Sequence, residues 1–244
     1  MGLQSACVRV LILSDIHGNA AALEAVVREP HDVVVCLGDV VGYGPEPGTT
    51  ARWIVQHSEV TVQGNHDRAL AAGVPPRCRP SFEWLAAALA PLGRSQLRQD
   101  EIRGLGGFPL TAQRTYDGVR CLFVHATPSD PLYRYLGPDL EEWAAEVAGL
   151  DADLVLVGHT HLQFDLDCGG TRVINPGSVG QPKDGDPRAA YAVLDDGVLR
   201  LKRAAYDIER TVAALERSGV GAEAVRDLTQ LLRTGRNPPP RPPP

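Results

Sequence analysis

The sequence predicts an α/β domain, because short apolar runs alternate with amphipathic helical patterns through much of its first two thirds. The runs are a few residues long and rich in Val, Leu and Ile, which is typical of buried strands. Polar residues, mainly Asp, His and Asn, follow directly after these runs. In open α/β sheets, ligands bind outside the carboxyl ends of the strands, so these polar residues indicate where a site should lie.

The elements of the first part follow in order along the chain. Asn19 is a candidate cap for a helix that ends before Pro30, and a second helical pattern covers Thr49–Gln56. Two more helices are predicted at Ser81–Ala90 and Ser95–Leu105. The five strand-like runs are Val8–Leu13, Val33–Leu37, Val60–Val62, Cys121–Val124 and Leu154–Val157.

The last third of the chain combines short strands with two helices. Asp195-Asp196-Gly197 is a predicted hairpin turn. The predicted strands are Arg172–Ile174, Ala190–Leu194 and Val198–Arg203. The first helical pattern consists of Ile208, Thr211, Val212 and Leu215, and the second of Val225, Leu228, Leu231 and Leu232, with Gly235 as its stop. We therefore predict a single domain over residues 1–236 and a disordered proline-rich tail over residues 237–244.

The composition excludes several classes of protein. Of the 244 residues, 43% are hydrophobic, yet no apolar run approaches the roughly 20 residues of a membrane-spanning helix. The formal net charge of −6 gives no global attraction to long nucleic acids or anionic lipid. The five Cys are scattered without a CxxC pair, and no signal-peptide pattern is present, so we expect a cytoplasmic protein. The sequence leaves the oligomeric state open.

Residue types that bind metals gather after the five strand-like runs. Imidazole and carboxylate together suit Mn, Fe, Co, Ni or Zn, and the lack of Cys in the set argues against a structural zinc site. Seven side chains are too many for one tetrahedral ion, whereas two ions that share a bridging carboxylate would use all of them. Such a pair can clamp a phosphoryl group and activate a bridging hydroxide. The candidate ligands are Asp15, His17, Asp39, Asn65, His125, His159 and His161.

Each of these residues also has an ordinary alternative role. Asp15-x-His17 alone is typical of a turn, and Asp39 alone is typical of a loop carboxylate. His125 alone fits a hydrogen-bonded core histidine, and Asn65 alone fits a turn residue. Their joint occurrence, each after a strand-like run, favours a metal site. Two ions would also make the site locally positive, so it would attract a phosphate ester although the whole protein is acidic.

The same residues resemble the signature blocks of the calcineurin-like metallophosphoesterase superfamily. Residues 175–182 (NPGSVGQP) resemble a further loop of its small bacterial and archaeal phosphodiesterase-type branch. The resemblance implies a four-layer α/β/β/α sandwich with two central mixed sheets, and the C-terminal strands are consistent with the second sheet. The blocks are Asp15-x-His17, Gly38-Asp39, Gly64-Asn65-His66-Asp67, His125 and Gly158-His159-x-His161.

The resemblance also implies a role for each residue. His66 would lie beside the substrate and would stabilise the transition state or protonate the leaving oxygen. The alternative for His66 is a residue that only orients Asp39. The implied cofactor is a pair of divalent ions, with Mn as the first choice and Fe, Zn, Ni or Co as alternatives. The first ion would be bound by Asp15, His17 and His161, the second by Asn65, His125 and His159, and both by Asp39.

The second and third blocks depart from the pattern of protein Ser/Thr phosphatases. Those members typically carry Gly-Asp-x-x-Asp-Arg-Gly, in which the Arg grips phosphate, and that Arg is missing here. Asp67 stands where they commonly have Glu. Both departures argue against a dedicated protein phosphatase. Candidate substrate contacts are the cations Arg68, Arg134 and Lys183, and the rings of Tyr43 and Tyr135, which could flank a base or aryl leaving group.

We therefore expect a metal-dependent hydrolase that attacks a small phosphate ester with a metal-bound hydroxide. A phosphodiesterase acting on small or cyclic nucleotides is the first choice. A phosphomonoesterase, including a protein Ser/Thr phosphatase, is the alternative. A scaffold with the same fold but without catalysis is a third hypothesis, against which the presence of all seven candidate ligands argues.

Overall fold

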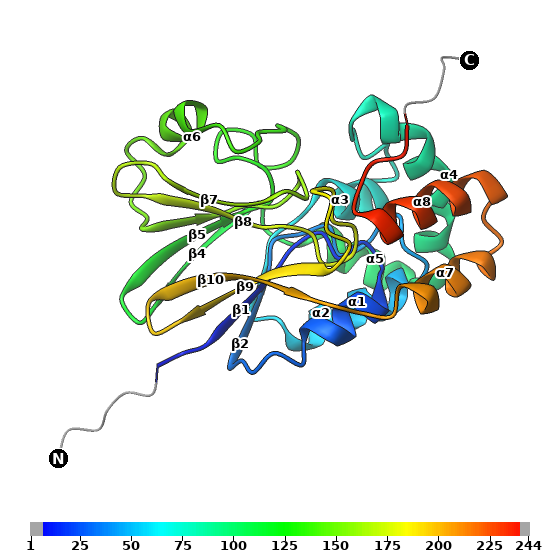
Figure 1. Ribbon diagram of the computed structural model, residues 1–244, viewed down its shortest axis with the longest axis horizontal. Helices are drawn as coiled ribbons and strands as arrows, with labels where there is room; N and C mark the ends of the chain where they lie inside the picture. Colours follow the sequence, from blue (N-terminus) through cyan, green and yellow to red (C-terminus); the bar gives the residue numbers. More distant parts are fainter. Residues whose placement is uncertain (1–6, 240–244) are drawn as a thin grey trace.

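Two mixed five-stranded sheets form the centre of the molecule in a computed structural model, which describes residues 7–239 (Figure 1). In the first sheet, the strand pairs formed by the two C-terminal strands of the chain are antiparallel and the other pairs are parallel. In the second sheet, each of the two edge strands is antiparallel to its neighbour and the other pairs are parallel. The order of the first sheet is β10 (Val198–Ala204), β9 (Ala189–Asp195), β1 (Val10–Leu13), β2 (Val33–Cys36) and β3 (Val60–Thr61). The order of the second is β4 (Thr111–Tyr116), β5 (Val119–Val124), β6 (Leu154–Leu156), β8 (Arg172–Pro176) and β7 (Gln163–Asp167).

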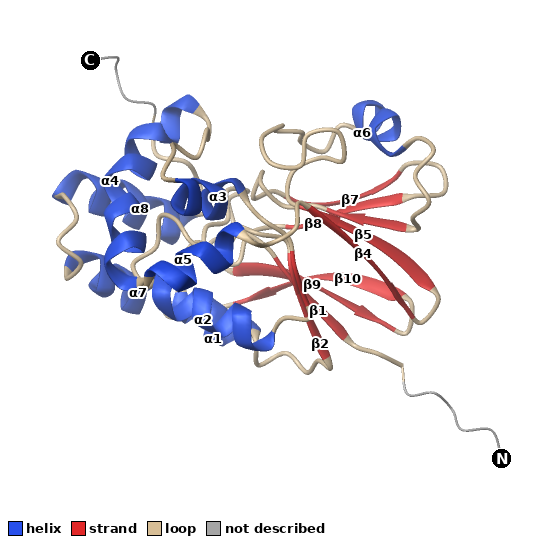
Figure 2. Ribbon diagram, turned by 180° about the vertical axis from the view of Figure 1, so that it is seen from behind, coloured by secondary structure: helices blue, strands red, loops and turns tan. Residues whose placement is uncertain are grey.

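The central strands bury side chains on both faces of each sheet, so the molecule has three apolar layers between four layers of structure. Ile12, Leu37 and Phe123 lie in the layer between the sheets. The outer face of the second sheet packs against Trp143 and Val147 of α6 (Leu140–Val147). The outer face of the first sheet packs against α1 (Ala20–Val26), α2 (Pro47–His57) and α5 (Gln99–Gly106). The chain is therefore the predicted four-layer α/β/β/α sandwich (Figure 2).

The other helices gather beyond one end of the sandwich (Figures 1 and 2). Three of them share an apolar cluster, to which α4 contributes Phe82 and Leu85, α7 contributes Leu215 and α8 contributes Leu228. The four helices at this end are α3 (Asn65–Ala72), α4 (Pro80–Gln96), α7 (Ile208–Glu216) and α8 (Ala222–Thr234). No helix among the described residues is long and apolar enough to cross a membrane.

Several predicted helix ends and turns are confirmed. The Asn19 side chain accepts a hydrogen bond from the Ala22 amide and caps α1. Gly235 ends α8 in the left-handed conformation, with φ 63°. Asp196 and Gly197 have φ of 50° and 71°, which is the pattern of a type I′ hairpin between β9 and β10. The residues of the predicted tail that the structure describes, 237–239, are irregular, and residues 240–244 lie outside the described part.

The structure corrects the helices predicted between residues 81 and 105. α4 continues through Pro91 to Gln96, because its apolar face is held against α8 and this packing offsets the hydrogen bond that proline cannot donate. The chain is extended at Leu97 and Arg98, so the predicted second helix is shorter and begins only at α5.

The sequence suggested that the C-terminal strands belong to the second sheet, and the structure shows that only some of them do. β9 pairs with β1, with Ala192 opposite Ile12, so β9 and β10 extend the first sheet. Of the strands that follow β6 in the chain, only β7 and β8 lie in the second sheet. The five predicted strands of the first part are likewise divided, three in the first sheet and two in the second.

Candidate metal centre

The loops that follow β1, β2, β3, β5 and β6 meet at the end of the sandwich that faces the helices. Their strands belong to two different sheets, so the polar side chains do not line one sheet edge. They gather instead where the carboxyl ends of both sheets come together. All seven candidate ligands are buried there, each at most 3% exposed.

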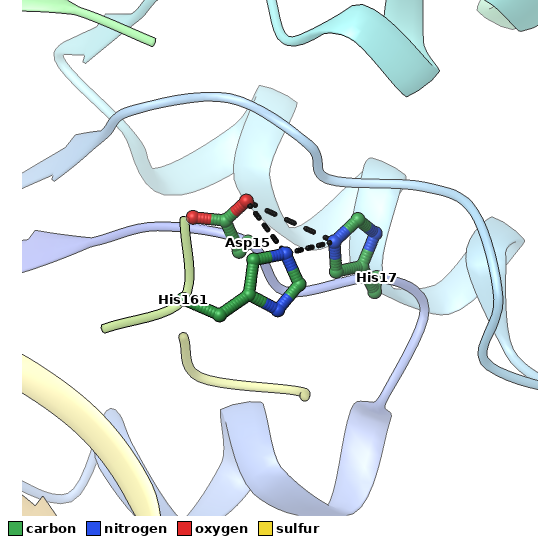
Figure 3. A group of neighbouring side chains, drawn as sticks. All are labelled: Asp15, His17 and His161. Atoms are coloured by element: carbon green, nitrogen blue, oxygen red, sulfur yellow. Dashed lines mark hydrogen bonds and ion pairs between the residues drawn. The ribbon is translucent and has the colours of Figure 1, made fainter. Parts of the chain in front are cut away.

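One group of side chains consists of Asp15, His17 and His161 (Figure 3). The Nε2 atoms of His17 and His161 are 3.1 Å apart. Asp15 Oδ1 lies 3.3 Å from Nε2 of His161 and 3.8 Å from Nε2 of His17. This Oδ1 atom is buried and has no hydrogen-bond partner among the described residues. A buried carboxylate oxygen without a donor is costly, and a cation at the meeting point of the three side chains would satisfy it.

A second group consists of Asp39, His125 and His159, with Asn65 beside it. His125 Nε2 lies 3.4 Å from Asp39 Oδ2, 3.2 Å from His159 Nδ1 and 3.1 Å from Asn65 Oδ1. Asp39 Oδ2 also lies 3.7 Å from Nε2 of His17 in the first group. Two adjacent histidine–carboxylate groups that share Asp39 are consistent with a dinuclear metal site.

Backbone carbonyls set which nitrogen each histidine turns toward the cluster. In His17, His125 and His161, Nδ1 lies 3.1, 2.8 and 2.6 Å from a carbonyl oxygen, that of Val41, Leu37 and Gln181 respectively. An Nδ1–H donated to that oxygen leaves Nε2 with its lone pair free for a cation. His159 has the opposite arrangement, with Nε2 3.4 Å from the Tyr133 carbonyl oxygen and Nδ1 toward the cluster. The four rings therefore turn four nitrogens, each of which can bind a cation when it carries no proton, toward one small volume.

The loops bend sharply at the ligands themselves. Left-handed backbone is uncommon for residues other than glycine and costs about 1–3 kcal/mol each, so it persists only where the surrounding structure holds it. Here the bends at alternate residues turn Asp15 and His17 to the same side. The left-handed ligands are Asp15 (φ 52°), His17 (48°), Asp39 (52°), His159 (64°) and His161 (61°).

Two glycines of the sequence blocks are required by close approach. A Cβ atom at Gly64 would collide with the Asp39 carboxylate. One at Gly158 would collide with the Ser14 hydroxyl and crowd the Asp15 carboxylate. Glycine at 64 lets the loops after β2 and β3 close around Asp39, and glycine at 158 lets the loop after β6 of the second sheet approach Asp15.

The charges of the cluster favour a cation. Burial disfavours the Asp39 carboxylate, but His125 and His66 beside it outweigh burial and hold its pKa well below its usual range. Burial likewise opposes charge on His125, yet Asp39 raises the pKa of that ring to about 9. Burial keeps the pKa of His17 and His159 well below the ordinary value. Two carboxylates thus face a single protonated ring, and divalent ions would supply the missing positive charge.

His66 lies against the cluster at the start of α3. Its backbone N–H donates to Asp39 Oδ1 at 2.8 Å, and its ring is 4.6 Å from the Tyr43 ring and 5.1 Å from the His17 ring, measured between centroids. Burial lowers the pKa of His66 to about 4, so the ring is neutral at pH 7. A neutral imidazole donates a hydrogen bond from one nitrogen and accepts at the other.

Asp67 organises the site although the sequence pattern did not identify it as a site residue. Its carboxylate accepts hydrogen bonds from the backbone N–H groups of Val40, Val41 and Gly64, at 3.0–3.2 Å. These bonds join the second block to the third. An Asp at the third position of a helix, after a glycine cap, is the signal that could have revealed this role.

The candidate substrate contacts lie in different surroundings. Tyr43 is buried, with its ring 4.9 Å from that of His17, and the Tyr135 ring is 3.8 Å from that of His159. Arg68 is exposed on α3. Arg134 forms ion pairs with Glu142 and Glu146 of α6. The two tyrosines, and not these arginines, are thus in ring contact with the cluster.

Comparisons with known proteins place these features in context. A family model of the calcineurin-like phosphoesterase superfamily domain matches residues 8–196. The uncharacterized protein MJ0912 of Methanocaldococcus jannaschii is 30% identical over 223 residues, which cover 82% of this chain and 89% of that protein. The phosphodiesterase YfcE of Escherichia coli is 28% identical over 209 residues, which cover 78% and 89%. The crystal structure of a metallophosphoesterase from Sphaerobacter thermophilus superposes with a TM-score of 0.78 at 30% identity and covers 94% of this chain and 99% of that one.

Proposed function

The chain belongs to the calcineurin-like phosphoesterase superfamily, and from this premise we propose that it is a phosphodiesterase acting on small or cyclic nucleotides. The family is one of metal-dependent phosphoesterases, so the substrate is a phosphate ester. The observation that carries the proposal is the set of adjacent buried histidine–carboxylate groups around Asp39. Preference for a diester is supported by the relative named as a phosphodiesterase, and by the lack of the Arg motif typical of protein phosphatases.

We assign the seven buried side chains as ligands of two divalent ions. The unpartnered oxygen of Asp15 and the four inward-facing ring nitrogens support the assignment. Imidazole, carboxylate and amide ligands together suit Mn²⁺, our first choice, and leave Fe, Zn, Ni and Co as alternatives. The proposed ligands of one ion are Asp15, His17 and His161, those of the other are Asn65, His125 and His159, and Asp39 is shared.

Divalent ions bound there would activate a water molecule and offset charge on the phosphoryl oxygens. His66 is the proposed catalytic residue among the side chains that are not ligands. Contact with Tyr43 and the backbone bond to Asp39 fix its position. Because its pKa is low, the ring would act as a neutral hydrogen-bond donor to the substrate and pass a proton to the leaving oxygen only as charge develops there.

The proposal is tested by metal loading and a substrate panel. We expect the protein, after chelation and dialysis against Mn²⁺, to hold two ions per chain by elemental analysis. We expect it to hydrolyse bis(p-nitrophenyl) phosphate and 2′,3′- or 3′,5′-cyclic nucleotides faster than p-nitrophenyl phosphate. Faster turnover of the monoester or of a phosphopeptide would instead favour the phosphomonoesterase. Protein that binds no metal and turns over none of these compounds would overturn the proposal. The cytoplasmic location stays a prediction of the sequence.

A further inference from the structure

A small cavity opens beside the metal centre, between the loop that precedes α4 and the loop that follows β8. Its volume is about 60 Å³, and its lining includes Tyr43, Arg79, Tyr135, Thr160 and Lys183. A cavity of this size has room for a compact polar group. The lining combines aromatic rings with two cations.

The cavity adjoins the proposed ligands through its walls. Tyr135 stacks on His159, with ring centroids 3.8 Å apart, and Tyr43 contacts His17 edge-on at 4.9 Å. Thr160 lies between the ligands His159 and His161 in the chain, and the Lys183 amide donates to the His161 carbonyl at 3.3 Å. A group in the cavity would therefore be separated from the metal centre by little more than one side chain.

Lys183 brings a positive charge to this cavity without a carboxylate to match it. Its Nζ lies 4.3 Å from the centre of the Phe82 ring and 5.8 Å from that of Tyr43. Within the described part of the chain, no carboxylate lies within ion-pair distance of Nζ, and the neighbouring Asp184 is taken by Arg203. Lys183 is half-buried, and a cation that is partly removed from water is favoured by a neighbouring anion, for which rings compensate only in part.

Arg79, which is exposed, supplies a second cation to the lining of the same cavity. Its guanidinium lies over the Tyr135 ring, 4.8 Å from the centre, and it forms no ion pair with any described residue. In contrast, Arg134, on the loop that also carries Tyr135, is paired with two glutamates. Both cations line the same small cavity, where a phosphate or carboxylate could pair with them.

We propose that this cavity is a second anion subsite, in which Lys183 and Arg79 hold a phosphate or carboxylate of the substrate other than the phosphoryl group being hydrolysed. The proposal rests on the phosphodiesterase function proposed above and narrows it. The preferred substrates are small phosphodiesters that carry a further anionic group, whereas simple cyclic nucleotides, with a single phosphate, leave the subsite empty.

The first test compares two esters that differ only in that group. Thymidine 5′-(p-nitrophenyl phosphate) and its 3′-phosphorylated derivative release the same chromophore by the same reaction. We expect the Mn²⁺-loaded protein to have a kcat/KM about tenfold or more higher for the 3′-phosphorylated ester, mainly because its KM is lower. This factor is the scale of one hydrogen bond to a charged group. Lys183→Met and Arg79→Gln should each remove most of that preference. Lys183→Arg should keep it, and Arg200→Met, at an exposed position of β10, is the matched control for loss of a surface cation.

The outcomes separate the subsite from the proposed function. Equal turnover of both esters by the unaltered protein would overturn the subsite and leave the phosphodiesterase standing. A Lys183→Met variant that lost the same factor on both esters would also overturn it, because the cation would then serve the reacting phosphoryl group. Thermal unfolding of each variant, followed by circular dichroism, checks that loss of the fold does not cause the change in kcat/KM.

The second test measures binding without turnover. Calorimetry with inorganic phosphate is performed on the chelated full-length protein, so that no ion contributes an anion site. We expect binding that Lys183→Met and Arg79→Gln weaken by about tenfold and that Lys183→Arg and Arg200→Met leave within about threefold. No binding by the unaltered protein, or binding that neither substitution changes, would overturn the subsite. Phosphate binding that depends on Lys183, with turnover of neither ester, would support the subsite and overturn the phosphodiesterase.

Discussion

The two halves of the proposed metal centre have the same number of side chains and different charge. The first group contains the carboxylate of Asp15 with two histidines, and the second contains the neutral amide of Asn65 with two histidines. Both face Asp39. With Asp39 shared equally, the first group offers one more negative charge than the second. We infer that an ion in the first group is held more tightly, and that the second ion is the one that exchanges.

Asp39→Ala should produce the largest effect, because it removes the side chain that both halves share. We expect loss of both ions at micromolar Mn²⁺ and a fall in kcat on the order of 10³-fold or more, since charge stabilisation by the ions is lost. Elemental analysis and turnover of bis(p-nitrophenyl) phosphate measure both effects. Retention of one full equivalent of metal would show that one half does not need the shared carboxylate.

His66→Ala should lower the rate without affecting either half. The ring is placed against the cluster but is not among the proposed ligands, so metal content should stay at the unaltered level. The expected fall in kcat is about 10²–10⁴-fold, the usual scale of general acid–base assistance. If metal were lost together with activity, His66 would be a ligand or would only orient Asp39. It would then have to be counted with the side chains that hold the ions.

Asp15→Asn and Asn65→Asp test the charge difference directly, because each substitution gives the two halves the same number of carboxylates. Asp15→Asn should weaken the tighter Mn²⁺ equivalent by about 10–100-fold or more, the scale reported even for residues that only support ligands. Asn65→Asp should tighten the weaker equivalent. Calorimetric titration of chelated protein with Mn²⁺ resolves the two steps. Equal affinities in the unaltered protein would contradict the inferred difference.

The smallest expected effect is the one that removal of metal has on stability, which should fall while the fold is kept. Free Mn²⁺ at about 100 times its dissociation constant adds about 2.7 kcal/mol to the free energy of unfolding per site. We therefore expect a melting temperature several degrees lower after chelation, with most of the gain restored by the first equivalent of Mn²⁺. A melting temperature that does not respond to Mn²⁺ would contradict binding to the native site.

The sequence predicts that the candidate ligands lie close together, as they do in the structure, and it predicts their arrangement only in part. Polar residues after apolar runs identify Asp15, Asp39 and His159, because strand ends place such residues together. The runs do not reveal that two sheets are involved, since the pairing of β9 with β1 depends on a contact between distant segments. The inverted ring of His159 depends on a carbonyl of Tyr133 that no pattern marks.

The sequence did not predict elements in which few apolar side chains mark the pattern. β4 has mostly exposed side chains, so its pattern does not stand out from a loop. α3 begins within the third block, where the polar residues that serve the site conceal the helical pattern. Lys183 is recognisable in the sequence as a cation near the loops, whereas its cavity is completed by Phe82, about one hundred positions earlier in the chain.

The origin of the ligands in two sheets gives the centre a mechanical role. Asp15 and His17 follow a strand of the first sheet, and His161 follows a strand of the second. Asp39 and His125 likewise come from opposite sheets. Ions bound as proposed would link the two sheets at one end of the sandwich, in addition to the apolar layer that the sheets share. Loading the centre would then slow amide hydrogen exchange along both sheet edges at once, far beyond the residues that touch an ion.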